Sequence, residues 1–137
     1  MKNGRPILLL EDDEIDVVAI QRALKELNIK NPLVVCENGT QGLEWLRAHL
    51  NAPPVVILTD IDMPVMNGLE FLAKVKLDPD LQKLPVVILS TFREESDRAS
   101  AFKLGVAGYM IKPIDATKYL SIMKTIAEYW QSSELPF

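Results

Sequence analysis

Acidic side chains, a hydroxyl and an amine follow four of the apolar runs in this chain. They are Glu11, Asp12 and Asp13 after one run, Asp60 and Asp62 after another, and Ser90 and Lys112 after two more. Carboxylates gathered in one place repel one another, by on the order of 4 kcal/mol per pair at about 4 Å and an effective dielectric constant near 20. A hard cation with oxygen ligands, such as Mg²⁺, relieves that repulsion, and Lys112 adds a second positive charge. The set predicts phosphoryl transfer, with Asp60 as the nucleophile and Ser90 as a hydrogen-bond donor.

The elements that must position these side chains are five short apolar runs, at 6–11, 32–37, 53–60, 85–91 and 106–113. The runs are continuous rather than alternating, which is typical of strands buried on both faces of a parallel sheet. Stretches with helical periodicity lie between and after them, at 17–27, 43–50, 68–76, 94–105 and 115–131. This order predicts an α/β fold of five β-α units, with right-handed crossovers that place helices on both faces of one sheet.

One alternative is that the acids only cap helices. Asp13, with Asp16 three residues further on, suits the N-terminus of the first helix. Capping accounts poorly for an acid pair, a second acid-terminated strand and a strand-terminal lysine together. Because ligands bind beyond the carboxyl ends of the strands in open α/β sheets, we expect these residues to form one site.

Composition excludes several other classes of protein. No apolar run approaches the roughly 18 residues of a membrane span, and no secretory signal is evident. The net charge of −4, with scattered basic residues, argues against direct nucleic-acid binding. A single histidine, His49, excludes a multi-histidine metal site and suits a solvated helix end, and a single cysteine, Cys36, excludes an internal disulfide. We therefore expect a cytoplasmic protein.

The sequence resembles the receiver domain of bacterial two-component response regulators over about residues 5–130. Four segments carry the resemblance: LLLEDD, TDIDMP followed by VMNG, VVILST, and GYMIKP. The resemblance implies a doubly wound five-stranded parallel sheet, (βα)5, with strand order 2-1-3-4-5. It also implies one receiver domain over 1–137, with a short tail at 131–137. Its role would be signalling rather than enzymatic: Asp60 takes a phosphoryl group from a sensor histidine kinase and loses it slowly.

The resemblance also implies a metal site. Asp12, Asp60 and the backbone carbonyl of Asp62 would hold Mg²⁺, and Glu11 would act mainly through water. The extra carboxylate of Asp62 beside the site leaves the lifetime of the phosphorylated state open.

A switch is implied as well. Ser90 would draw inward on phosphorylation and Tyr109 would turn into the space left, changing the face formed by the fourth helix, the fifth strand and the fifth helix. Lys112–Pro113 would be a cis peptide. At the position of Ser90, receiver domains more often have threonine. At the position of Thr91, they commonly have a smaller residue.

The last helix predicts a homodimer. Its apolar positions cover most of the helix circumference, whereas packing on a sheet needs a stripe of about 100°. The surplus side chains are Tyr119, Ile122, Ile126 and Tyr129, and such a patch usually marks an interface. The alternative is that the tail folds back over it. The ending IAEYWQSSELPF is similar to single-domain regulators that partner phytochrome-like histidine kinases.

Three further functions compete with the phosphoacceptor. The DIDM stretch fits the nucleophile motif of haloacid-dehalogenase-type phosphatases, but that family carries it on its first strand and usually adds a cap domain. A degenerate receiver, acting only as a protein-binding module, would not need the complete set of acids, hydroxyl and lysine. A flavodoxin-like FMN binder would need a hydroxyl-rich loop where this chain has EDDEID.

Overall fold

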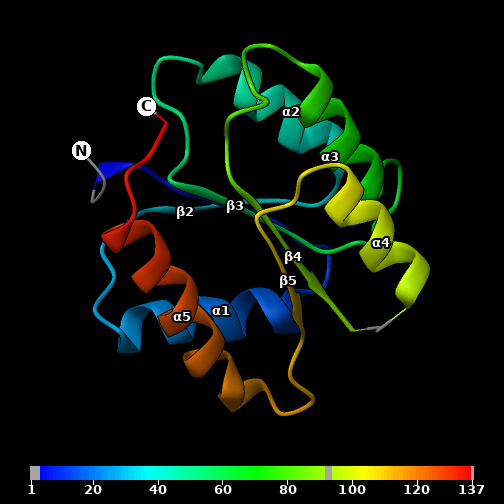
Figure 1. Ribbon diagram of the computed structural model, residues 1–137. Helices are drawn as coiled ribbons and strands as arrows, with labels where there is room; N and C mark the ends of the chain where they lie inside the picture. Colours follow the sequence, from blue (N-terminus) through cyan, green and yellow to red (C-terminus); the bar gives the residue numbers. More distant parts are fainter. Residues whose placement is uncertain (1–3, 92–93, 137) are drawn as a thin grey trace.

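Five parallel strands form one sheet with helices on both faces in the computed structural model, which describes residues 4–91 and 94–136 (Figure 1). The strands are β1 (Ile7–Leu10), β2 (Leu33–Cys36), β3 (Val56–Thr59), β4 (Val86–Ser90) and β5 (Gly108–Ile111). Their spatial order is β2-β1-β3-β4-β5. The predicted fold class and strand order are confirmed.

The helices divide into two groups, one on each face of the sheet. They are α1 (Glu14–Glu26), α2 (Gly39–Ala48), α3 (Gly68–Leu77), α4 (Glu95–Lys103) and α5 (Tyr119–Ser132), with a 3-10 turn, η2 (Ala116–Lys118), before α5. Figure 1 shows α1 and α5 together on one face and α2, α3 and α4 on the other. Alternate residues of β1 serve the two layers: Leu9 packs with α1 and α5, while Leu8 and Leu10 pack with α2 and α3. Among the described residues, no helix is long and apolar enough to cross a membrane.

Three helices begin with side-chain caps immediately after loops that follow strands. Asp13 Oδ1 accepts from the Ile15 amide at 2.9 Å, so the capping role expected for Asp13 is confirmed. Asn38 caps α2 in the same way. A capping box starts α3, where Asn67 and Glu70 exchange bonds of 2.8 and 3.0 Å. These caps fix where each helix starts relative to the sheet edge.

The interface predicted on the last helix is wrong for two of its four residues. Tyr119 and Ile126 are 1% and 3% exposed and belong to the core between α1, α5 and the sheet. Ile122 is partly buried against the same core, and only Tyr129 is largely exposed, at 44%. The reason is that α5 packs on both the sheet and α1, so its apolar surface must be wider than a single stripe.

The tail partly follows the alternative in which it folds back. Leu135 packs against the core that α5 covers. Pro136 lies further along, beside His49 and Leu50 at the end of α2. The tail therefore covers apolar surface of its own chain.

Gly68, the first residue of α3, generates a prediction about the loop after β3. A Cβ on Gly68 would lie 2.0 Å from the backbone oxygen of Asp60. We expect Gly68→Ala to lower the free energy of unfolding by about 2 kcal/mol or more, because backbone cannot yield as a side chain does. Gly108→Ala is the matched control: its Cβ would meet Val87 only at 3.7 Å, and we expect a change within about 0.5 kcal/mol. Equal urea midpoints for the two variants would contradict this.

Candidate functional site

The carboxyl ends of β1, β3 and β5 deliver the candidate residues to one edge of the sheet. Leu10 and Thr59 are in register, so the residues that follow them, Glu11 and Asp60, emerge side by side. Backbone pairing continues past the strand ends, since the Asp60 amide donates to Leu10 at 3.0 Å and the Lys112 amide donates to Ser90 at 2.8 Å. The positions of these side chains are therefore set by the sheet itself.

Three carboxylates form the predicted acidic cluster. One oxygen from each of Glu11, Asp12 and Asp60 lies within 4.8 Å of the others. Glu11 and Asp60 are buried, whereas Asp12 is exposed. The Asp60 carboxylate is oriented by the Ile61 amide, which donates to its Oδ1 at 2.8 Å. Closely spaced carboxylate oxygens with one open side suit a hard divalent cation that keeps some of its water.

The ammonium of Lys112 lies among three carboxylates. Its Nζ is 2.7 Å from Glu11 Oε2, 3.0 Å from Asp16 Oδ2 and 3.2 Å from Asp60 Oδ2. The lysine side chain is only 5% exposed, so these contacts replace the water that a charged amine would otherwise bind. The lysine is therefore held beside the carboxylate on which the predicted chemistry would occur.

Burial and charge shift the pKa values of this group. Burial alone would lower the pKa of Lys112, but the carboxylates of Glu11, Asp60 and Asp16 outweigh it and leave the pKa raised. Burial raises the pKa of Glu11 to about 7, against the opposing effect of Lys112 and with a further contribution from Asp60. Burial also raises the pKa of Asp60, although Lys112 acts to lower it. In the absence of a cation the site therefore holds protons more tightly than isolated carboxylates do.

The two predicted switch residues occupy neighbouring strands. Ser90, the last residue of β4, is 2% exposed and pairs with Ile111. Tyr109 pairs with Ile88, two residues before Ser90, so Ser90 and Tyr109 project from the same face of the sheet. The Tyr109 hydroxyl is buried and has no hydrogen-bond partner among the described residues. This arrangement is compatible with a coupled pair.

The structure bears on two further expectations at this edge of the sheet, the Lys112–Pro113 bond and Asp62. The described residues contain no cis peptide bond, so the predicted cis Lys112–Pro113 bond is wrong for this structure. The trans form is the more stable by about 0.5–1 kcal/mol even before proline. Asp62 is exposed and its side chain lies outside the acidic cluster, so a role for its backbone carbonyl stays a prediction.

Sequence reasoning missed two participants, Asp16 and Tyr119. Asp16 was expected only as a partner in capping α1, but its Oδ2 accepts from Lys112 and its Oδ1 accepts from the Tyr119 hydroxyl at 2.9 Å. Tyr119 was expected on the surface. The one available signal was that Asp16 falls in the first turn of the helix that directly follows Glu11 and Asp12.

Comparisons with known proteins agree with this geometry. Residues 7–124 match the model of the response regulator receiver domain family. The chain is 32% identical over 128 residues to the response regulator Rcp1 of Synechocystis sp. (strain ATCC 27184 / PCC 6803 / Kazusa), covering 90% of this chain and 87% of Rcp1. The crystal structure of the phosphorylated cyanobacterial phytochrome response regulator RcpA superimposes with a TM-score of 0.90 at 34% identity, covering 98% of this chain and 99% of RcpA. The Mn(2+)-bound form of Rcp1 superimposes with a TM-score of 0.87 at 31% identity, covering 98% and 100%.

The raised pKa values predict how metal-free stability depends on pH. Between pH 4.5, the ordinary value for Glu11, and about 7, its folded value, the folded chain holds a proton that the unfolded chain releases. The free energy of unfolding should therefore fall as pH rises through this window, by about 1–3 kcal/mol. Urea denaturation in EDTA at pH 5 and pH 7 measures the fall.

Two controls accompany this measurement. Glu11→Gln removes the titrating group and should flatten the dependence, and Mg²⁺ should stabilise the wild type more at pH 7 than at pH 5, because the cation requires ionised carboxylates. Equal stability of the metal-free wild type at both pH values would contradict the prediction.

Proposed function

The chain belongs to the response regulator receiver domain family, whose members are phosphoacceptors in two-component signalling, and from this premise we propose that Asp60 is its phosphoacceptor. One observation carries the proposal. The Asp60 carboxylate is buried at the end of β3, 3.2 Å from the Lys112 ammonium and within 4.8 Å of the oxygens of Glu11 and Asp12. Positive charge can thus be concentrated at one nucleophilic oxygen.

The chemistry is a phosphoryl transfer in which an Asp60 oxygen forms a bond to phosphorus while the donor's bond to phosphorus breaks. The leaving group departs with that electron pair. Lys112 offsets the charge on a phosphoryl oxygen, and Ser90 donates a hydrogen bond to another. The product is an acyl phosphate, which water attacks slowly at phosphorus to restore the carboxylate. The protein is a signalling component in this proposal and does not turn over phosphate esters.

Mg²⁺ is the proposed cofactor. Glu11, Asp12 and Asp60 would hold it, together with the backbone carbonyl of Asp62, and when bound it would offset the charge of the phosphoryl oxygens. The donor set supports this, because its ligands are closely spaced carboxylate oxygens. The Mn(2+)-bound form of the relative Rcp1 supports a divalent cation as well.

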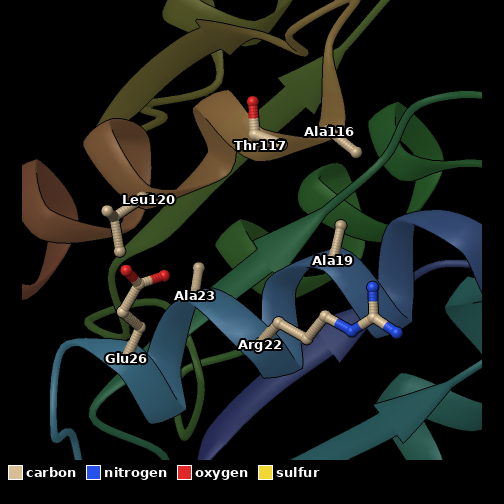
Figure 2. Close-up of a pocket in the computed structure, with 7 residues that line it drawn as sticks. All are labelled: Ala19, Arg22, Ala23, Glu26, Ala116, Thr117 and Leu120. Atoms are coloured by element: carbon tan, nitrogen blue, oxygen red, sulfur yellow. The ribbon is translucent and has the colours of Figure 1, made fainter.

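The proposed partner is a sensor histidine kinase of the phytochrome-like kind, supported by the similarity to Rcp1 and RcpA. A phosphoryl donor must approach the edge of the sheet that holds Asp60. A pocket lies between α1 and the start of α5, where Figure 2 shows Arg22 and Thr117 among its lining residues; none of the candidate site residues lines it. Exposed Ile15, in the first turn of α1, and exposed Ile114, in the loop after β5, are neighbours in sequence of the site residues Asp16 and Lys112. Phosphotransfer profiling against candidate sensor kinases would identify the partner.

We further propose that the protein works in the cytoplasm without direct contact with nucleic acid or membrane. The net charge of −4 supports this, because a polyanion or an anionic lipid surface would repel it.

Replacing the proposed phosphoacceptor should abolish phosphoryl uptake. Acetyl phosphate with Mg²⁺ should phosphorylate the wild type, since the site itself supplies the catalysis. Asp60→Asn should show no retained phosphate on a phosphate-affinity gel, and EDTA should stop uptake by the wild type. Asp62→Asn is the matched control: it removes a neighbouring exposed carboxylate and should leave uptake intact, whatever its effect on the lifetime of the product. Retention by Asp60→Asn equal to that of the wild type would refute the assignment.

A homodimer through β5 and α5 is also proposed. β5 is an edge strand, and an apolar pocket beside it is lined by Val87, Ala107, Gly108, Met110, Thr125, Ile126 and Tyr129. Tyr129 is exposed at its margin, and Ile122 adds apolar surface on the same helix.

Light scattering at high micromolar concentration tests the dimer. The wild type should be dimeric and Tyr129→Glu monomeric, because a charge would be buried without a partner. Ser121→Glu places the same charge at another exposed position of α5 and should stay dimeric. A monomeric wild type with and without beryllofluoride would leave the patch to a different partner, such as the kinase.

A further inference from the structure

Asp16 stands apart from the other carboxylates around Lys112. It lies on α1, whereas Glu11 and Asp60 follow strands of the sheet. It is also the only one of the three that is not a member of the acidic cluster in the described structure. Glu11 and Asp60 would be committed to a cation when one binds. Asp16 would then remain as the carboxylate available to the lysine alone.

The contact between Asp16 and Lys112 is a hydrogen bond as well as an ion pair. The Lys112 ammonium donates to Asp16 Oδ2 at 3.0 Å. A hydrogen bond between charged groups is directional as well as strong. It therefore fixes the direction of the ammonium, which a flexible four-carbon stem would leave free.

Asp16 is itself held by a second, independent contact. The hydroxyl of Tyr119 donates to Asp16 Oδ1 at 2.9 Å, while Oδ2 accepts from Lys112. Tyr119 is 1% exposed and packed in the core between α1 and α5. The hydrogen bond to a carboxylate adds to burial in raising the pKa of Tyr119, so its hydroxyl stays a donor. A rigid buried ring therefore orients the carboxylate that orients the lysine.

We propose that Asp16, braced by Tyr119, is a positioning residue that holds the Lys112 ammonium in place for phosphoryl transfer to Asp60. An ammonium has three N–H donors. In the dephosphorylated state they face Glu11, Asp16 and Asp60, and Asp60 is the most distant at 3.2 Å. A phosphoryl oxygen arriving at Asp60 takes over that third donor while Asp16 keeps its own. This inference rests on the proposed function of Asp60.

The test compares rates of phosphoryl uptake from acetyl phosphate in Mg²⁺. Asp16→Asn keeps the shape but loses the charge, and Tyr119→Phe keeps the buried ring but loses the brace. We expect uptake to slow about tenfold in Asp16→Asn, because this variant loses a charge-assisted contact with Lys112. We expect it to slow about threefold in Tyr119→Phe, because Tyr119 acts on Lys112 only through Asp16. Glu14→Gln removes an exposed acid from the same turn of α1 and should stay within about twofold of the wild type.

The kinetic quantity that changes distinguishes a positioning role of Asp16 from a structural one. Asp16 does not touch the donor, so the loss should fall on the maximal rate and not on the acetyl phosphate concentration that gives half of it. Rates are expressed per folded protein, measured by urea denaturation of each variant. As a spectroscopic signature, beryllofluoride should shift the Tyr119 ζ-carbon resonance in the wild type and in Glu14→Gln, but not in Asp16→Asn.

The possible outcomes test the positioning role of Asp16 separately from the phosphoacceptor role of Asp60. Wild-type maximal rates in both Asp16→Asn and Tyr119→Phe would overturn the inference and leave Asp60 as the phosphoacceptor. A loss confined to the half-saturating concentration would also overturn it. Uptake by Asp60→Asn equal to the wild type, or none by the wild type, would refute the proposed function and the inference with it.

Discussion

The buried ammonium of Lys112 is the constraint on which the site depends. A charge that is 5% exposed is tolerated only where its partners compensate the lost water. Here the partners are the residues that follow β1 and β3 and a residue of α1. These three elements must therefore meet at one edge of the sheet, with each carboxylate close enough to contact the ammonium. Glu11, Asp16 and Asp60 provide more negative charge than one lysine neutralises. Burial raises the pKa values of Glu11 and Asp60 despite the lysine, and the surplus of negative charge makes the site suitable for a divalent cation.

The ends of the strands and the starts of the helices place the polar residues at this edge of the sheet. The central strands β1, β3 and β4 are apolar except at the last residues of β3 and β4, Thr59 and Ser90, so polar groups appear where the strands end. The Asp13 cap starts α1 directly after Glu11 and Asp12, and the first turn of this helix brings Asp16 to Lys112. The Gly68 amide donates to the Ile61 backbone oxygen at 2.9 Å, and this hydrogen bond closes the loop between β3 and α3. Helix starts and the chemical site are thus parts of one local arrangement.

Most of the sheet and the strand-borne part of the site could be predicted from the sequence, because both depend on local patterns. Continuous apolar runs identify buried strands, and residues just after them must share the carboxyl edge. Asp16 and Tyr119 could not be predicted in the same way. They are 103 residues apart and meet only because α1 packs against α5. Periodicity shows that a helix has an apolar surface, but not how many neighbours cover it, which is why Tyr119 was expected in an interface.

Two tyrosines at β5 pack in different layers of the fold. Tyr109 is on β5 itself and packs towards the layer of α2, α3 and α4. Tyr119 follows β5 and packs in the layer of α1 and α5. In the proposed mechanism Ser90 acts towards the first layer and Lys112, through Asp16, towards the second. A change at Asp60 would then reach both faces of the sheet at its β5 edge, without a displacement of the central strands, whose full burial makes them the hardest part of the molecule to move.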